Sequence, residues 1–189
     1  QNENPLAYTE ALGYCRSICK KAALGGAKLD IIDIGGGFPV TYINPVLPIE
    51  QFCRPINEYL DRFFPRYRII AEPGRFISAH AAILATRVVG KSRRSGVWWY
   101  YLDDGIYGSF SGKIYDHIDY PMLMTARGKT HNSVLAGPTC DSTDVIYENI
   151  VLPELSIGDT LFFNCMGAYT NASASTFNGF PKPGVVVVE

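Results

Sequence analysis

The chain has 189 residues, of which 47% are hydrophobic and 19% are charged, a composition typical of a globular protein with one sizeable core. Seventeen Lys and Arg residues against 18 Asp and Glu residues give a formal net charge of -1, and no basic run occurs. The sequence therefore gives no electrostatic support for binding nucleic acid or a membrane surface. Its longest apolar stretches have the length of a strand, too short to cross a bilayer.

Two units of helix and strand are predicted in the first half of the chain. Apolar residues at helical spacing predict a helix over 5–24, which a pair of glycines ends. The apolar run 29–34 predicts a strand that is buried on both faces. A second helix is predicted over 48–64 and a second buried strand over 67–71. Helix and strand in alternation, with short connections, are typical of parallel βα units.

The second half is predicted to be mostly β, in the form of a Greek-key-like sandwich or a barrel. Turn residues separate its predicted strands, which are 81–89, 97–102, 133–136, 160–164 and 185–188. We therefore place a domain boundary near residue 80, with an α/β domain over 1–80 and a β-domain over 81–189.

The α/β domain is expected to be incomplete. Two βα units cannot cover both faces of a parallel sheet, and a full (β/α) barrel would need several more units upstream. The chain begins at Gln1 rather than at a methionine and stops directly after a strand-like run of valines. We expect that both ends are cut, and that residues 1–80 are the C-terminal part of a TIM-like (β/α)8 barrel.

Five cysteines are an odd number, and their spacing is not that of a disulfide framework. No pair of histidines accompanies them at the spacing of metal ligands, so we expect no metal site. Free thiols are typical of a reducing compartment, which favours a cytoplasmic protein. The cysteines are Cys15, Cys19, Cys53, Cys140 and Cys165.

The three consecutive glycines Gly35, Gly36 and Gly37 follow the first predicted strand directly. Such a run lets backbone N–H groups surround an anion, although a flexible strand exit has the same appearance. The next predicted strand ends close to Glu72 and Arg75, which place a carboxylate and a fixed cation at the neighbouring strand end. Barrel enzymes commonly bind phosphate at this position, whereas the alternative is a surface salt bridge in a turn.

Several segments, in matching order over nearly the whole chain, resemble the motifs of the alanine-racemase-like decarboxylases, which act on ornithine, lysine, arginine or diaminopimelate. The resemblance is closest to the ornithine decarboxylases. It implies pyridoxal 5'-phosphate as the cofactor and a homodimer with shared active sites. The segments are 33–39, 71–75, 104–110, 115–117, 137–141, 167–170 and 175–180.

The resemblance implies that the cofactor phosphate is held by the glycine loop, chiefly Gly37, together with Arg75 and Tyr169. The same motif supplies Glu72, Pro73 and Gly74 around the cofactor. Glu72 would pair with the pyridine nitrogen and keep the ring protonated, so that the ring draws in the electrons that decarboxylation releases. Related racemases have an arginine there, and Glu72 therefore favours decarboxylation.

Cys140 is implied to return a proton to the substrate carbon across the dimer interface, although a lone cysteine in a β-domain is more often a small buried hydrophobe. Asp116 and Asp141 are implied to bind the far ammonium group of the substrate, and either one alone could be a turn or cap residue. Tyr115 and Phe177 are expected to line the pocket. We assign no metal or general-base role to either His117 or His131.

The cofactor also needs a lysine for its Schiff base, and none of the lysines of the chain follows a buried strand in the family's lysine motif. The lysines are Lys20, Lys21, Lys28, Lys91, Lys113, Lys129 and Lys182. We therefore expect the lysine upstream of Gln1, and no activity from these 189 residues alone.

The expected reaction is the conversion of L-ornithine to putrescine, a step of polyamine biosynthesis. A lysine decarboxylase or a dual lysine/ornithine decarboxylase is the nearest alternative, because one methylene is worth only about 1–3 kcal/mol of discrimination. An inactive regulatory homologue, similar to the antizyme inhibitors, is the rival from another class. A free-standing β-domain that acts as a binding module is a third possibility.

Overall fold

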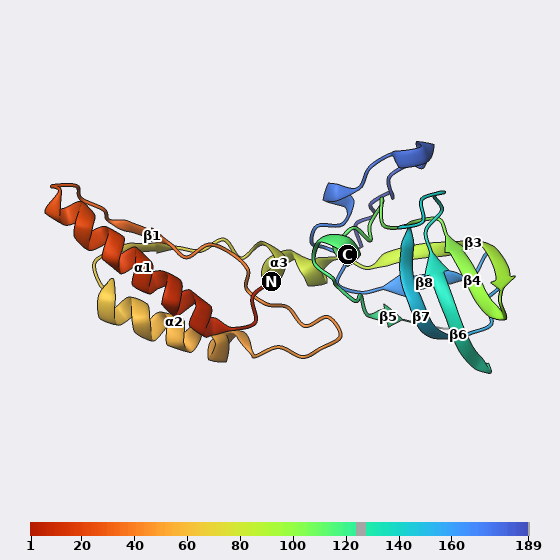
Figure 1. Ribbon diagram of the computed structural model, residues 1–189, viewed down its shortest axis with the longest axis horizontal. Helices are drawn as coiled ribbons and strands as arrows, with labels where there is room; N and C mark the ends of the chain where they lie inside the picture. Colours follow the sequence, from red (N-terminus) through yellow and green to blue (C-terminus); the bar gives the residue numbers. More distant parts are fainter. Residues whose placement is uncertain (124–127, 189) are drawn as a thin grey trace. The chain divides into compact units, whose positions relative to one another are not determined.

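The computed structural model of the protein describes residues 1–123 and 128–188 (Figure 1). The chain divides into two compact units, Gln1–Ile77 and Ser78–Glu189. The described part of the chain contains no helix that is both long enough and apolar enough to cross a membrane.

The first unit contains the predicted helices and strands, and the strands are shorter than expected. Strands β1 and β2 pair in parallel, with Ile32 opposite Ile69. A five-residue helix, α3, follows β2 and was not predicted. The elements are α1 (Pro5–Leu24), β1 (Ile31–Asp33), α2 (Ile49–Phe63), β2 (Arg68–Ile70) and α3 (Gly74–Ser78).

Helix α1 has the bounds that the sequence predicts, and its ends explain them. The Asn4 side chain accepts a hydrogen bond from the backbone N–H of Leu6 at 3.0 Å, and Pro5 occupies the first turn, where its missing N–H costs nothing. Gly26, with φ of +83°, follows the helix and adopts the left-handed conformation that glycine tolerates best. Local capping therefore accounts for where both ends of this helix lie.

One face of β1 packs on the two long helices, which lie side by side in Figure 1. Ile32 joins a buried cluster with Leu12 of α1 and Phe52 of α2. In contrast, Ile31 and Ile70, on the other face, are 41% and 38% exposed. The expectation that both strands are buried on both faces is therefore wrong for the described chain, because both helices contribute to a single cluster on one side.

The second unit is built on one curled sheet with the strand order β5-β8-β3-β4-β6-β7 (Figure 1). All neighbouring strands are antiparallel except β4 and β6, which run parallel. A second sheet, which a sandwich requires, is not found among the described residues of this unit. The elements are β3 (Leu84–Arg94), β4 (Val97–Leu102), α4 (Gly112–Tyr115), β5 (Met122–Leu123), β6 (Thr130–Ala136), β7 (Val145–Pro153) and β8 (Thr160–Phe163), with 3₁₀ turns at Ala79–Ala81, Asn171–Ser173 and Phe177–Gly179.

Strand β3 explains why a single sheet forms. Its first half pairs with β8 and its second half with β4, and the register shifts between Val88 and Gly90. An irregularity of this kind bends a strand and increases its twist. The eleven residues of β3 therefore belong to two halves of one curled surface.

Of the five strands predicted in this unit, four are confirmed and one is wrong. Two further strands of the structure were not predicted. Strands β3, β4, β6 and β8 overlap the predicted ranges, and β4 has the predicted bounds. Strands β5 and β7 were not predicted. The valines at 185–188 form no strand and are 76% to 88% exposed, because no described strand lies beside them to supply hydrogen-bond partners.

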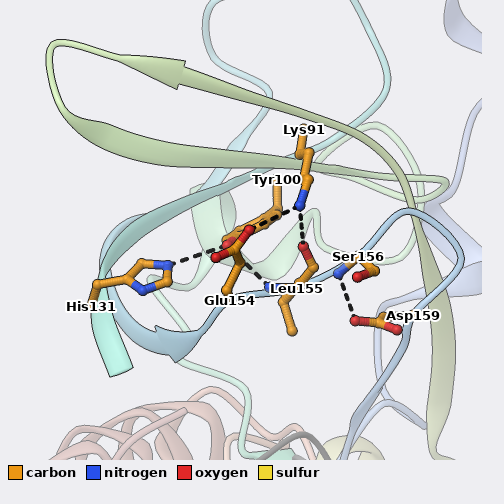
Figure 2. Close-up of polar contacts among 7 residues, drawn as sticks. All are labelled: Lys91, Tyr100, His131, Glu154, Leu155, Ser156 and Asp159. Atoms are coloured by element: carbon orange, nitrogen blue, oxygen red, sulfur yellow. Dashed lines mark hydrogen bonds and ion pairs between the residues drawn. The ribbon is translucent and has the colours of Figure 1, made fainter. Parts of the chain in front are cut away.

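A polar network inside this unit fixes the turn that follows β7 (Figure 2). The hydroxyl of Tyr100, a fully buried residue of β4, accepts a hydrogen bond from the backbone N–H of Leu155 at 3.1 Å and lies 3.2 Å from Nε2 of His131. Lys91 Nζ donates to the Leu155 carbonyl at 3.1 Å and to Glu154 Oε1 at 3.2 Å. Side chains from β3 and β4 therefore satisfy both backbone groups of Leu155.

Replacement of Tyr100 by Phe should destabilise the protein by about 1–3 kcal/mol, because the buried N–H of Leu155 loses its acceptor. Urea denaturation of the protein that carries these residues measures the loss. Tyr14→Phe is the matched control, because its ring is 67% exposed and its change should be near zero. An equal effect of the two substitutions would contradict this account of Tyr100.

Candidate functional site

The glycine loop lies directly beside the segment that carries Glu72, at the carboxyl ends of β1 and β2. The Glu72 N–H donates to the Gly35 carbonyl at 2.8 Å, and Asp33 Oδ1 accepts from the Gly35 N–H at 2.8 Å. A Cβ atom on Gly36 would lie 2.5 Å from the Glu72 carbonyl oxygen. The two segments touch through their backbones, so a side chain at Gly36 would force them apart.

Tyr8 anchors this loop from α1. Its hydroxyl donates to the Gly36 carbonyl at 2.6 Å, and burial, followed by the nearby Cys53, raises the pKa of Tyr8. Gly37, with φ of +84°, comes next and brings its carbonyl to the N–H of Asn2 at 2.8 Å. The loop is therefore held by hydrogen bonds from α1 and from the N-terminal segment.

Arg75 is a buried cation, with only 7% of its surface exposed. It lies on α3 directly after Gly74, and its Nη1 donates to the hydroxyl of Tyr42 at 2.9 Å. Glycine N–H groups and a guanidinium form a donor set that suits a phosphate group. The residues predicted to bind the cofactor phosphate in this unit therefore fit that group chemically.

In the second unit, the buried carboxylate of Asp144 joins two loops, 104–110 and 137–144. Its Oδ1 accepts from the Ile106 N–H at 2.8 Å and its Oδ2 from the Thr139 N–H at 3.0 Å. A Cβ on Gly105 or on Gly137 would lie 2.3 or 2.1 Å from Asp144 Oδ1. Gly105 and Gly137 are therefore required because the Asp144 carboxylate occupies the space that a side chain at either position would need.

Asp104 organises the first of these loops. Its Oδ1 accepts from the N–H groups of Gly105 and Ser109 at 2.7 and 2.9 Å, and a Cβ on Gly108 would overlap the same oxygen. Burial raises the pKa of the Asp104 carboxyl, while the bonds from Ser109 and Gly105 oppose the rise. The DGxxG pattern at 104–108 is therefore a turn closed by its own aspartate.

Asp141 is held by two residues. Its Oδ2 accepts from the Tyr107 hydroxyl at 2.6 Å, and its Oδ1 accepts from the N–H and the hydroxyl of Thr143 at 2.8 and 2.9 Å. The bond from Tyr107, followed by those from Thr143, lowers the pKa of Asp141. The Asp141 carboxylate in turn raises the pKa of Tyr107. The pair therefore stays as an ionised carboxylate and a protonated phenol.

Cys140 is exposed, and the Asn178 amide donates to its sulfur at 3.2 Å. Phe177 stacks on the Tyr107 ring with centroids 4.2 Å apart, and Ser175 donates twice to the Tyr107 carbonyl, at 2.8 and 3.1 Å. The structure thus brings together three predicted site residues, Cys140, Asp141 and Phe177. The alternative that Cys140 is a buried hydrophobe is wrong for the described chain.

The other predicted site residues of this unit are exposed. Tyr115 ends α4, and Asp116 follows it. Tyr169, which is 57% exposed and has a φ of +55°, accepts from the Ser111 hydroxyl at 3.2 Å through its carbonyl. The glycine loop, Glu72 and Arg75 belong to the first unit, whereas Tyr169 belongs to the second.

Sequence reasoning gave no role to Tyr8, Tyr42, Tyr107, Asp144 or Asn178. Tyr107 and Asn178 lie inside segments that carry the family resemblance, and this position was the one available signal for them. Nothing in the sequence marks Tyr8 or Tyr42. Among residues 1–123 and 128–188, no group of three or more His, Cys, Asp or Glu residues is placed to hold a metal ion.

Comparison with known proteins identifies the family of the chain. A family model described as pyridoxal-dependent decarboxylase, C-terminal sheet domain, matches residues 16–167. A lysine/ornithine decarboxylase of Selenomonas ruminantium is 40% identical over 190 residues, which cover all of this chain and 48% of that protein. An ornithine decarboxylase of Caenorhabditis elegans is 39% identical over 196 residues, 94% of this chain and 46% of that protein.

A solved structure has the same fold. The lysine/ornithine decarboxylase of Vibrio vulnificus, complexed with cadaverine, superposes with a TM-score of 0.91 at 49% identity, over 96% of this chain and 50% of that one. The chain spans about half the length of the relatives that it matches. The match to the family model covers most of the chain and both units. The chain therefore belongs to the family of pyridoxal-dependent decarboxylases, whose C-terminal sheet domain it carries.

Proposed function

We propose that this chain is part of an enzyme that uses pyridoxal 5'-phosphate to decarboxylate a basic amino acid, with L-ornithine as substrate and putrescine as product. The observation that carries the proposal is the adjacency of Cys140 and Asp141, a thiol and an ionised carboxylate held by separate contacts on one loop. A thiol can return a proton to carbon, and a carboxylate can bind the ammonium group that distinguishes a basic substrate.

The first unit supplies the groups that would hold the cofactor. The N–H groups of Gly36 and Gly37 and the guanidinium of Arg75 would bind its phosphate, while Gly35, whose N–H donates to Asp33, would shape the loop around it. Tyr169 of the second unit is proposed as a further phosphate ligand. Bound pyridoxal phosphate supplies the sink for the electrons released when carbon dioxide leaves. Glu72 would hold a proton on the ring nitrogen, and Pro73 and Gly74 would shape the turn between Glu72 and Arg75.

The first unit is proposed to be the C-terminal part of a (β/α)8 barrel. Two features support this assignment: β1 and β2 are parallel, and their candidate cofactor residues lie at the carboxyl ends of the strands, where barrel enzymes place their sites. The face that carries Ile31 and Ile70 is also uncovered, and further βα units would cover it. The lysine that the cofactor requires would come from one of those units.

A homodimer with shared sites is part of the proposal. Cys140, Asp141 and Phe177 would face the cofactor of a second copy, with Tyr115 and Asp116 as further lining of the same pocket. The exposure of Cys140 and of Phe177 supports this arrangement, because both are open to a partner. Lysine is the alternative substrate, and the names of the relatives include both amino acids.

The decisive experiment is to assay the full-length protein that carries these residues for release of carbon dioxide from L-ornithine and L-lysine. Release that depends on pyridoxal phosphate, with a higher kcat/KM for ornithine, supports the proposal. A higher kcat/KM for lysine would move the substrate to the alternative. No release from either amino acid would favour the regulatory rival, an inactive homologue similar to the antizyme inhibitors.

Replacement of Cys140 by Ala in the full-length enzyme should lower kcat about 10²–10⁴-fold, because the proton donor is lost. Absorbance of the bound cofactor should not change, since the cofactor contacts proposed in this chain lie elsewhere. Cys15→Ala on α1 is the control and should leave kcat unchanged. A Cys140→Ala enzyme with normal kcat would remove Cys140 from the reaction.

Replacement of Gly36 by Ala should weaken cofactor binding about tenfold or more, because the new Cβ meets the Glu72 backbone at 2.5 Å and separates the two loops. Titration of the apoprotein with pyridoxal phosphate, followed by absorbance, measures the change. Gly13→Ala inside α1 is the matched control, since its Cβ would meet Tyr59 at an ordinary 3.5 Å. Equal affinity in both variants would show that the loop contact has no role in binding.

A further inference from the structure

The second unit has a groove of about 490 Å³ where the β3–β4 hairpin, the start of β6 and the end of β7 meet. Its lining is polar, charged and aromatic, in contrast to the apolar core that the same sheet covers. None of the residues that line it is proposed above to bind the cofactor or the substrate. The charged, amide and ring-bearing side chains of the lining are those of Arg93, Trp98, Lys129, His131, Asn132 and Glu154.

The groove forms where the core-facing side of the sheet reaches solvent. Trp98 on β4 pairs with Arg93 on β3 and with Ser133 on β6. Alternate residues of a strand share a face, so Tyr100 lies on the same side as Trp98. Tyr100 and Ser133 are fully buried, whereas Trp98 is half-buried and Arg93 is exposed. The core face therefore ends in an indole and a cation that a ligand can reach.

Trp98 offers a flat apolar surface that is already held in place. Its ring stacks on the buried Tyr100 ring at an angle of 17°, with centroids 6.1 Å apart, and the His131 ring lies 6.4 Å away. Lys91 Nζ and the guanidinium carbon of Arg93 lie 5.0 and 5.8 Å from the Trp98 ring centroid. A nucleobase can stack on an aromatic side chain of this kind. Trp98 is therefore a stacking surface with cations beside it.

The groove also has an excess of positive charge. The Glu154 carboxylate is compensated by Lys91, whose Nζ lies 3.2 Å from Glu154 Oε1 (Figure 2). Arg93 and Lys129 are exposed and add two further cations. Arg93 donates through Nε to the Gly96 carbonyl at 3.2 Å, which leaves its Nη groups for a ligand. The charge in the groove therefore favours an anion.

His131 adds a hydrogen-bond donor. The Tyr100 oxygen accepts from the Leu155 N–H, and its own proton is satisfied by His131 Nε2, 3.2 Å away (Figure 2). A neutral imidazole that accepts at Nε2 carries its proton on Nδ1. His131 is therefore oriented by a buried hydroxyl and keeps one N–H donor for a ligand.

We propose that this groove binds a nucleotide, with the base stacked on Trp98 and the phosphate groups bound by Arg93, Lys129 and His131. Guanidinium and ammonium groups are common phosphate donors in proteins, and an indole suits a base. A small carboxylic acid would use the cations and leave the indole without a role. A long nucleic acid is not favoured, because the chain has a net charge of -1 and no basic run. The inference does not depend on the proposed function.

The test is isothermal titration calorimetry of the full-length protein with ATP. The protein is first saturated with pyridoxal phosphate, so that ATP does not enter the proposed phosphate site of the cofactor. We expect ATP to bind with a Kd in the micromolar range. Adenosine, which lacks the phosphates, and tripolyphosphate, which lacks the base, should each bind at least about tenfold more weakly, because each uses half of the groove.

Two pairs of neighbouring residues provide variants with matched controls. Trp98→Leu should weaken ATP binding about tenfold or more, whereas Trp99→Leu, on the opposite face of β4, should not. Arg93→Gln should weaken ATP binding about tenfold, because a phosphate donor is lost. Arg94→Gln is its control, since the Arg94 guanidinium lies over Trp99, 4.6 Å from the ring centroid. Both arginines are exposed, so these two variants keep the fold even if Trp98→Leu does not.

The absence of ATP binding would overturn the inference. Tripolyphosphate that binds as tightly as ATP would reduce the groove to a general anion patch and would also overturn it. An equal loss of affinity in Arg93→Gln and Arg94→Gln would show that ATP responds to net charge and not to this groove. A folded Trp98→Leu protein with unchanged affinity would contradict the stacking. All these readouts measure binding, so a protein without decarboxylase activity leaves the test intact.

Discussion

The buried carboxylate of Asp144 is the interaction on which the second unit depends. It holds the loops 104–110 and 137–144 at a distance that only glycine tolerates at Gly105 and Gly137. Burial of such a group is favourable only when its lone pairs are used, and here backbone N–H groups use them on both oxygens. Tyr107 and Asp141 stand on these two loops, so their contact at 2.6 Å is a consequence of the Asp144 bridge.

In the first unit, too, a glycine allows a close approach, but the group that approaches it is the backbone of Glu72 rather than a side chain. Gly35, Gly36 and the Glu72 segment touch directly, and Tyr8 holds the contact from α1. In both units a glycine is needed because another group occupies the space of its side chain. The glycines therefore allow the chain segments to approach closely. This close approach determines where the hydrogen-bond donors and the carboxylates of the candidate site lie.

The sequence predicts the bounds of elements that neighbouring residues determine. Capping at Asn4 and the glycines after Leu24 define α1, and turns on both sides define β4, so both elements have their predicted bounds. Strand β7 was missed because Glu148 and Asn149 interrupt its apolar pattern. The valines at 185–188 have high strand propensity, but a strand needs a partner, and propensity alone does not supply one. Likewise, the motifs identify Asp141 and Gly36, but their contacts with Tyr107 and Tyr8 span 34 and 28 positions and depend on the tertiary fold.

The uncovered face of the β1–β2 pair has a consequence for handling the protein. Two strands are fewer than an independently stable sheet needs, and both have open edges. Ile31 and Ile70 lie exposed on this face, beside the edges of the two strands. Such a surface favours self-association through added strands, as in domain-swapped or fibrillar assemblies. Expression of these residues by themselves should therefore produce aggregates through the first unit.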